Sequence, residues 1–212
     1  MITAGPTYEA IDPVRFIGNR STGKMGLEIA LVFAQKGAKV TLILGPSVLD
    51  VDHPNIKLIR VQSAAEMAKH AIKGYKKAQI AVMAAAVADY TPKTVAKEKI
   101  KKKGAGLKIE LERTQDIAAK LGSIKSKKQF NVGFALETNN EAASAKGKLA
   151  KKNFDIIVLN SLKDKGAGFA HDTNKVTIFD NKGKIHKYKL KSKKEVANDI
   201  VQLVEQLMSS KK

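Results

Sequence analysis

The 212-residue sequence contains no cysteine, no tryptophan and very little arginine. Without cysteine, the chain can form no disulfide, no thiolate metal site and no cysteine nucleophile. The low aromatic content, 5% of residues, leaves few side chains on which single-stranded bases could stack. Of the 39 basic residues only four are arginine, the residue that most often clamps phosphates and contacts bases. These absences exclude thiol chemistry and weigh against sequence-specific recognition of nucleic acid.

Long hydrophobic runs are also missing. The longest, IAVMAAAVA at residues 80–88, is far shorter than the ~18 residues that a membrane-spanning helix needs. Met1 leads directly into an apparent strand, without the basic and apolar regions that make up a signal peptide. We therefore expect a cytoplasmic protein with no membrane partner.

Positive charge is abundant, with a formal net charge of +19 and a pI near 9.9. Such a balance suits a polyanionic partner, and a nucleic-acid-binding module without catalysis is one interpretation. The lysines are spread along the whole chain, however, and are not gathered in one segment. The other interpretation, which we favour, is a solvated lysine-rich surface on which a few lysines bind a small anionic ligand.

Apolar strands alternate with amphipathic helices through the chain, which predicts an α/β fold with a mostly parallel sheet covered on both faces. We expect one domain, residues 1–212, built as a Rossmann-like three-layer sandwich. A Lys-rich flap at about 93–106 and a β-hairpin at about 175–190 would be added to it. Ser21 or Thr22 is expected to cap the first helix, and Thr114 the third. The expected strands are 1–5, 39–44, 56–61, 107–113, 130–137 and 155–160, together with 78–90, a strand that runs into a loop; the expected helices are 22–38, 63–75, 114–125, 139–153 and 193–208.

Polar clusters follow three of the expected strands. They are GPTYEAIDPVRFIGNRSTG at 5–23, AAAVADYTP at 84–92 and ALETNN at 135–140. Ligands of open α/β sheets bind at the carboxyl ends of the strands, so these clusters are the candidate site.

The segment GNRSTGKMG, residues 18–26, almost matches a phosphate-binding P-loop. Met25 stands where that motif needs the hydroxyl of Ser or Thr, and about sixteen residues separate the strand from the helix, too many for a P-loop. No G-x-G-x-x-G fingerprint occurs either, which argues against a dinucleotide-dependent oxidoreductase. Two interpretations remain open: a helix start that binds an anion, with cations nearby, or an ordinary capped helix.

The same segment carries a wider resemblance. TAGPTYEAIDPVRFIGNRSTGKMG, AAAVADYTP, EKIKK, QDIAAKL, VGFALETN, KLAKKNFDIIVLN and GFAHDTNKV resemble, in this order, the motifs of the phosphopantothenoylcysteine synthetase family. The resemblance implies a ligase of coenzyme A biosynthesis. Its substrates would be CTP with Mg²⁺, 4′-phosphopantothenate and L-cysteine, and its intermediate an acyl-cytidylate.

The family's organisation sets further expectations. In many bacteria this domain is fused to a flavin-dependent decarboxylase, and we expect no flavin in the present segment. The start at Met1 then indicates an excised or stand-alone synthetase domain. Family members are homodimers with active sites near the subunit boundary, and we expect the hairpin at 175–190 to supply the pairing edge.

The resemblance also assigns roles to individual residues. Asn19 would handle the acyl-cytidylate and its attack by cysteine, and the flap residue Lys99 would reach the triphosphate. The other residues implied for CTP are Met83, Ala84, Ala85, Asp89, Gln115, Asp116, Ile117, Ala118, Phe134, Lys148 and Lys152. Our own candidates for phosphopantothenate, beside Asn19, are Arg15, Arg20, Ser21, Thr22 and Gly23. The four histidines have no metal-ligand spacing, so Mg²⁺ would be held largely by phosphate oxygens.

Overall fold

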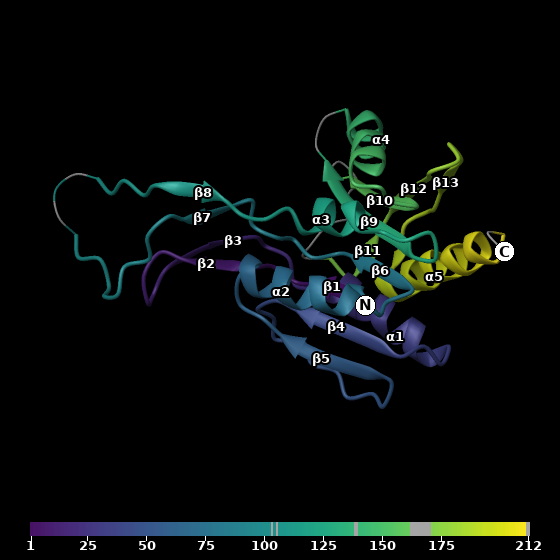
Figure 1. Cartoon of the computed structure of the whole chain (residues 1–212), viewed down its shortest axis with the longest axis horizontal. Coiled ribbons are helices and arrows are strands. Elements are labelled where there is room, and N and C mark those ends of the chain that lie inside the picture. Colours follow the sequence, from purple (N-terminus) through teal and green to yellow (C-terminus); the bar gives the residue numbers. More distant parts are fainter. Residues whose placement is uncertain (103, 105, 138–139, 162–170, 211–212) are drawn as a thin grey trace.

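The computed structural model describes residues 1–102, 104, 106–137, 140–161 and 171–210 (Figure 1). Residues 103 and 105 of the expected flap, and Asn139 at the expected start of the fourth helix, lie outside this part. The described residues form an 8-stranded central sheet and three two-stranded pairs. The sheet order is β13-β12-β10-β9-β6-β1-β4-β5. Its strands are β1 (Ile2–Ala4), β4 (Val40–Leu44), β5 (Ile56–Arg60), β6 (Ile80–Met83), β9 (Phe130–Glu137), β10 (Ile156–Ser161), β12 (Val176–Asp180) and β13 (Ile185–Lys187).

The strands from β10 to β5 are parallel to one another, and β12 joins β10 antiparallel. Numbered along the chain, the six parallel strands have the order 3-2-1-4-5-6, which defines the Rossmann fold. Helices cover both faces of the sheet, so the predicted three-layer α/β architecture is confirmed (Figure 1). The helices are α1 (Lys24–Gln35), α2 (Ala64–Tyr75), α3 (Ile117–Ser123), α4 (Glu141–Lys151) and α5 (Lys193–Ser209).

Alternation along the buried strands divides the core into two halves. In β10, Ile156 and Val158 pack with α1 and α5, whereas Ile157 and Leu159 pack with α2, α3 and α4. Successive side chains of a strand point to opposite faces, so a continuously apolar strand is what a doubly covered sheet requires. This is why those strands could be recognised from the sequence.

A long arm extends from the sheet (Figure 1), and its form was not expected. It consists of residues 8–18, 90–102 and 106–113, with the pairs β2 (Tyr8–Ala10)–β3 (Phe16–Gly18) and β7 (Tyr90–Pro92)–β8 (Leu111–Arg113). The segment 78–90, expected as a strand that runs into a loop, contains such a strand, whereas the expected strand 107–113 is wrong in extent. β6 ends at Met83, and only Leu111–Arg113 of the later segment is a strand, which pairs within the arm and not with the sheet.

Asp12 fastens the two halves of the arm together. Its buried carboxylate accepts hydrogen bonds from the guanidinium of Arg15 and from the backbone amides of Val14 and Ile100. Arg15 also donates to the carbonyl of Ile100 at 2.8 Å. The hydrogen bonds from Arg15 and Ile100 hold the pKa of Asp12 well below its usual range. These hydrogen bonds join the β2–β3 part of the arm to the segment that contains Ile100, which is far away in the sequence.

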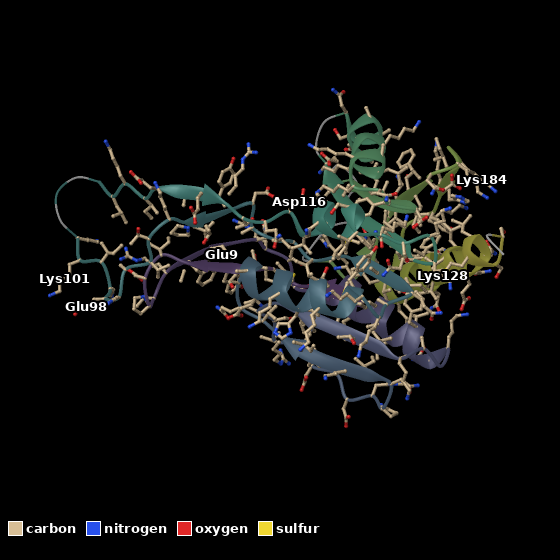
Figure 2. The ribbon with its side chains drawn as sticks, in the orientation of Figure 1. Glu9, Glu98, Lys101, Asp116, Lys128 and Lys184 are labelled. Carbon is tan, nitrogen blue, oxygen red and sulfur yellow. The ribbon has the colours of Figure 1, made fainter. Side chains whose placement is uncertain are left out.

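The β12–β13 hairpin agrees with the prediction. The two strands pair antiparallel, and Oδ1 of Asp180 accepts from the amides of Lys182 and Lys184 to close the turn. The remaining pair joins β11 (Thr173–Asn174) to β14 (Lys191–Ser192) beside the start of α5. Lys101, Lys128 and Lys184 lie on three separate parts of the molecule (Figure 2), in keeping with basic residues dispersed over the surface. Within the described residues, no helix combines the length and apolar character needed to cross a membrane.

Close packing of α1 on β1 depends on Gly26. A Cβ built at this glycine would lie 2.5 Å from Cβ of Ala4, whereas a Cβ on Gly147 in α4 would meet nothing within 4 Å. Gly26→Ala is therefore expected to lower the free energy of unfolding by about 2 kcal/mol through overpacking. Gly147→Ala, the matched change, should raise it by about 0.5–1 kcal/mol because it removes a helix-interior glycine. Urea denaturation of both variants measures the difference, and equal effects would contradict the packing argument.

Candidate active site

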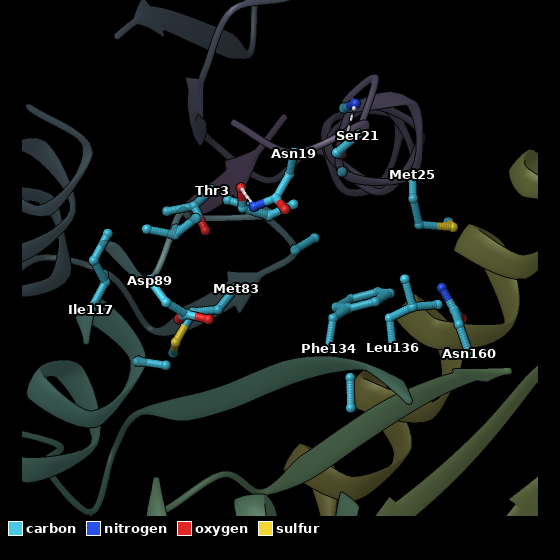
Figure 3. Close-up of a pocket in the computed structure, with 18 of the residues that line it drawn as sticks. Thr3, Asn19, Ser21, Met25, Met83, Asp89, Ile117, Phe134, Leu136 and Asn160 are labelled. Atoms are coloured by element: carbon cyan, nitrogen blue, oxygen red, sulfur yellow. Dashed lines mark hydrogen bonds between the residues drawn. The ribbon is translucent and has the colours of Figure 1, made fainter. Parts of the chain in front are cut away.

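A cavity of about 710 Å³ opens at the carboxyl ends of β1, β6, β9 and β10. The start of α1 and the segment before it form one side, and side chains of β9 form the opposite side (Figure 3). The cavity lies at the point where the chain order of the strands reverses, between β1 and β6. In Rossmann-type sheets this switch point leaves a crevice because the connections on its two sides run to opposite faces.

Most predicted site residues line this one cavity, although they come from distant parts of the sequence. They are Asn19, Ser21, Thr22, Gly23, Met83, Ala84, Ala85, Asp89, Gln115, Asp116, Ile117, Ala118, Phe134, Lys148 and Lys152. Arg15, Arg20 and Lys99 are not among the lining residues.

The start of α1 keeps hydrogen-bonding capacity toward the cavity. Its N-cap is Gly23, with φ of 83°, and no side chain caps the helix, so the expected caps Ser21 and Thr22 are wrong. Their hydroxyls accept from the amides of Gly23 and Lys24 only at 3.4 and 3.5 Å, which is weak geometry. A Cβ at Gly23 would lie 2.9 Å from Cδ1 of Leu44, so both space and backbone conformation require glycine. The helix start is thus suited to an anion.

Asn19 follows β3, and a hydrogen bond to the main chain orients its side chain. Its Nδ2 donates to the carbonyl of Ala86 at 2.9 Å, which joins the loop before α1 to the segment after β6. Figure 3 shows the carboxamide across the cavity from Phe134 and Leu136. The side chain is exposed and lines the cavity, so the amide is oriented by the protein while it remains accessible to a ligand.

The segment after β6 uses part of its backbone to bind the neighbouring strand. The amides of Ala84 and Ala86 donate to the carbonyls of Thr3 and Gly5 at 3.0 and 2.9 Å. These two N–H groups are therefore already hydrogen-bonded within the protein. The backbone contacts to a nucleotide that were predicted for residues 83–85 would have to use other main-chain groups of this segment. Asp89 comes next, and it lines the cavity, as Met83 does (Figure 3).

Lys148 on α4 and Lys152, which follows the last residue of α4, are oriented by carboxylates. Nζ of Lys148 lies 2.6 Å from Oε1 of Glu137, and Nζ of Lys152 lies 2.9 Å from Oδ2 of Asp116. Burial acts to raise the pKa of Asp116, but the Ala119 amide and Lys152 outweigh it and hold the pKa below its usual value. Each lysine is thus held by a carboxylate, and both line the cavity.

Asp116, not Thr114, caps α3. Its Oδ1 accepts from the amide of Ala119 at 2.9 Å, whereas the hydroxyl of Thr114 donates to the carbonyl of Ala88 at 2.6 Å. The predicted cap was wrong because the helix begins at Ile117, three residues later than expected. The Thr114 contact instead ties the base of the arm to the cavity wall.

Three predicted residues lie elsewhere. The Arg15 guanidinium is bound to Asp12 and Ile100 in the arm, and Arg20 is exposed without lining the cavity. Glu98 and Lys101, which flank Lys99 in sequence, lie at the far end of the arm from Asp116 (Figure 2). Within one chain the arm therefore holds Lys99 away from the cavity.

Sequence reasoning missed residues at the α1–α5 end of the cavity. They are Met25, Asn160, Asn174 and Lys193, and they line the cavity together with Lys24, one of the cations expected near the start of the first helix. Nδ2 of Asn174 donates to Oδ1 of Asn160 at 3.2 Å, and Lys24 forms a 2.6 Å ion pair with Asp172. Asn160 could have been predicted from the sequence, because it is a polar residue near the carboxyl end of an otherwise apolar strand, where ligands of such sheets bind. Among the described residues, no group of three or more His, Cys, Asp or Glu could hold a metal ion.

Comparison with known proteins extends over nearly the whole chain. The family model described as "DNA/pantothenate metabolism flavoprotein C-terminal domain" matches residues 1–208. A protein from an unknown prokaryotic organism named "Cysteine/Cysteine sulfinic acid decarboxylase" is 52% identical over 203 residues, 96% of this chain and 56% of that protein. The Bacillus subtilis (strain 168) "Coenzyme A biosynthesis bifunctional protein CoaBC" is 50% identical over 202 residues, 95% of this chain and 50% of that protein.

A solved structure confirms the fold. The crystal structure of the C-terminal domain of a coenzyme A biosynthesis bifunctional protein CoaBC superposes with a TM-score of 0.84 at 41% identity. The matched region covers 99% of this chain and 94% of the chain in that crystal structure. The chain spans about half the length of the curated relatives that it matches. The remainder of those proteins has no counterpart in the sequence.

Proposed function

The chain belongs to the family of DNA/pantothenate metabolism flavoprotein C-terminal domains, and from this membership we propose that it is a CTP-dependent ligase. It joins 4′-phosphopantothenate to L-cysteine in coenzyme A biosynthesis, in the cytoplasm, and gives 4′-phosphopantothenoylcysteine, CMP and pyrophosphate. The observation that carries the proposal is the single cavity in which all predicted site residues except Arg15, Arg20 and Lys99 meet.

The first step needs a carboxylate to attack the α-phosphate of CTP, with pyrophosphate as leaving group. Both reactants are anionic, so catalysis depends on positioning them and on cations that offset their repulsion. Lys148 on α4, Lys152 directly after α4 and the uncapped start of α1 supply positive potential around the cavity. Met83, Asp89 and Phe134 line the same cavity, where the nucleoside would be held.

The second step converts the acyl-cytidylate into an amide. The cysteine amine attacks the acyl carbon, CMP departs with the bonding electron pair, and the ammonium proton is lost to solvent. Charge develops on the acyl oxygen during the attack, and an oriented amide donor lowers its energy. Asn19 has this geometry because the Ala86 carbonyl fixes its carboxamide at the cavity edge.

Mg²⁺ would enter with CTP and neutralise part of the triphosphate charge. Mg²⁺ is usually held by one or two carboxylates together with substrate phosphates, and Asp89 faces the cavity as one such carboxylate. Asp116 is engaged by Lys152 and by the start of α3, so it is less suited. The donor set therefore fits a metal brought by the nucleotide and not a resident metal.

Pyrophosphate release tests the proposal. The protein with CTP, Mg²⁺, 4′-phosphopantothenate and cysteine should release pyrophosphate and CMP in equal amounts, and should form the amide product. Omitting phosphopantothenate should abolish both releases. Absence of product from correctly folded protein would refute the function, and measuring CO₂ from cysteine alone in parallel tests the decarboxylase named for one relative. The flavin-dependent decarboxylase expected as a partner would be a separate domain or protein.

We also propose that the arm, and not the β12–β13 hairpin, forms a homodimer interface. Large apolar side chains are exposed along it: Val14, Phe16, Tyr90, Val95, Leu107 and Leu111. Exposed apolar groups gathered on a thin projection are costly in a monomer and typical of a surface that another chain covers. Paired arms would bring Lys99 and Arg15 toward the cavity of the second copy.

Val14→Glu tests the dimer proposal, with Val48→Glu as the matched control. Val14 is 60% exposed on the arm, whereas Val48 is 101% exposed and lies outside it. A buried charge should weaken the dimer about 10- to 100-fold for Val14→Glu, and Val48→Glu should leave it unchanged. Light scattering during size-exclusion chromatography measures the masses. A monomeric wild type at micromolar concentration would remove the proposal.

A further inference from the structure

One face of the molecule gathers lysines that are far apart in the sequence. Residues 67–79, which form most of α2 and the turn after it, contain four lysines, and residues 117–129, which form α3 and the loop before β9, contain four more. Neither segment contains an aspartate or a glutamate. All of these lysines except Lys125 are exposed, and we call the exposed ones the α2–α3 lysine face: Lys69, Lys73, Lys76, Lys77, Lys120, Lys127 and Lys128.

The two segments are fastened to each other, so their lysines share one surface. Leu121 of α3 packs in the same core cluster as Ala71 and Tyr75 of α2. The side chain of Gln129 donates to the carbonyls of Tyr75 and Ala78 at 2.7 and 3.1 Å, which holds the loop before β9 against the end of α2. The fold therefore brings together lysines that the sequence places about 50 residues apart.

The ammonium groups of this face have no acidic partner within the part of the chain that the structure describes. None of the seven forms an ion pair or a side-chain hydrogen bond there, whereas Lys24, Lys148 and Lys152 at the cavity are each paired with a carboxylate. The positive charge of the face is thus open to solvent and to a partner.

The acidic groups that border the face are already bound within the protein. Glu66 accepts from a backbone amide at the start of α2 at 2.7 Å. Asp116 is paired with Lys152, and the buried Asp155 is paired with Lys125. None of these carboxylates is therefore available to offset the exposed lysines.

Local stability does not account for the face. Lys69, Lys73 and Lys76 follow one another at spacings of four and three along one side of α2, and like charges placed so destabilise a helix slightly. The negative end of the helix dipole favours Lys73 in the last turn, but Lys69 lies further from that end and Lys127 lies in a loop. A field of one sign on one face is typical of a surface that attracts an oppositely charged partner.

The residue types on this face favour a phosphate backbone as that partner. Lysine is depleted in protein–protein interfaces, where Trp, Tyr and Arg make the strongest contacts, and the two segments expose none of these three. Their one exposed large apolar side chain is Ile124, whereas a helix that lies in a lipid surface needs an apolar face. Lysine contacts to phosphates position a nucleic acid but do not read its bases.

We propose that the α2–α3 lysine face binds the phosphate backbone of a nucleic acid, independently of its sequence. α2 leads to the amino end of β6 and the loop leads to the amino end of β9, whereas the cavity lies at the carboxyl ends of the strands. Lys128 accordingly lies at the end of the molecule away from Lys101 in the arm (Figure 2). None of the seven lysines lines the cavity, so the inference does not rest on the proposed ligase function.

Fluorescence anisotropy with a labelled random-sequence DNA duplex of about 30 base pairs, over a series of salt concentrations, tests the inference. The face variant combines Lys69→Gln, Lys73→Gln, Lys76→Gln and Lys127→Gln. The matched control combines Lys182→Gln, Lys184→Gln, Lys187→Gln and Lys189→Gln, which change four exposed lysines in and directly after the β12–β13 hairpin. Each set lowers the formal net charge by four, from +19 to +15, so the two variants differ only in where the charge is removed.

The wild type should bind duplexes of different sequence equally, with an affinity that falls steeply as salt is raised. At about 100 mM salt the face variant should bind about 10- to 100-fold more weakly, and its slope of log affinity against log salt should be shallower by about 3–4. The control variant should stay within about threefold of the wild type. The melting temperature of the face variant should equal or exceed that of the wild type, because repulsion between like charges is relieved.

Several outcomes would overturn the inference. Equal weakening by both sets would show that the overall charge, and not this face, attracts the duplex. An unchanged face variant, or a wild type that does not bind at about 100 mM salt, would remove the inference directly. Vesicles that contain phosphatidylserine, and polyglutamate, are offered separately. If either bound more tightly than the duplex and lost its binding in the face variant, the partner would be a membrane surface or an acidic protein.

Failure of the proposed function would be separately visible. The face variant should keep the wild-type rate of ligation, because its substitutions lie outside the cavity. A wild type that forms no phosphopantothenoylcysteine but binds the duplex through this face would leave the inference standing. The double variant Lys73→Gln with Lys127→Gln should show about half the change in slope, and it gives the same comparison with fewer substitutions.

Discussion

Asn19→Asp is expected to lower the rate of ligation by about 100- to 1000-fold, the usual cost of losing one preorganised donor to a developing oxyanion. The wild-type Nδ2 donates to the carbonyl of Ala86 at 2.9 Å. A carboxylate cannot make that bond, so the side chain should turn away from Ala86. Its negative charge would also face an acyl oxygen that becomes more negative as cysteine attacks.

The two chemical steps should respond differently to this substitution. Pyrophosphate release without cysteine reports formation of the acyl-cytidylate, which needs no donor to the acyl oxygen. Rapid quenching with and without cysteine should show a stoichiometric burst of pyrophosphate in Asn19→Asp, followed by slow amide formation. Equal slowing of both steps would refute the role assigned to Asn19.

Asn198→Asp is the matched control for this experiment. Asn198 is exposed on α5, and its Nδ2 also donates to a backbone carbonyl, that of Lys194, at 3.0 Å. The two substitutions therefore remove the same kind of hydrogen bond and add the same charge. Asn198→Asp should keep wild-type activity, since Asn198 does not line the cavity.

The central sheet could be predicted because its signals are local. Each buried strand is a short apolar run, and the segments between strands carry helical periodicity, so composition along the chain was sufficient. The arm could not be predicted in this way. β7 and β8 are three residues each and pair across a long intervening segment, and short non-local pairs leave little trace in the sequence. The alanines after β6 are apolar but irregular, because they bind the segment after β1.

The candidate site could be predicted only in part, because some of its residues have a local signal in the sequence and others depend on non-local packing. Polar clusters after strands predicted the segments that contain Asn19 and Asp89, and the family resemblance selected these two residues, Lys148 and Lys152 within the chain. Lys193 gave no signal, since Lys194 beside it is chemically identical and only the packing of α5 on α1 buries one and exposes the other. Lys99 and Arg15 belong to segments that match the family motifs, but their distance from the cavity could not be predicted, because it depends on the conformation of the arm.

Lys125→Met should lower the free energy of unfolding by about 3 kcal/mol, because it leaves the buried carboxylate of Asp155 without its ammonium partner. Nζ of Lys125 lies 2.6 Å from Oδ2 of Asp155, and the side chains are 9% and 2% exposed. For a chain of this size the melting temperature should fall by about 6–12 °C. Lys128→Met, an exposed neighbour, should cost almost nothing.

The ion pair lies at the amino end of β10, whereas the cavity lies at the carboxyl ends of the strands, so activity below the melting transition should be unchanged. Asp155 also accepts from the amide of Asn131 at 2.7 Å, and its own carbonyl accepts from the amide of Asn181, so it connects β9 to the β12–β13 turn. Asp155→Asn added to Lys125→Met removes the buried charge and should recover part of the loss. If Lys125→Met cost less than about 1 kcal/mol, the pair would behave as a solvated surface contact, and the connection between these strands would have to come from backbone pairing alone.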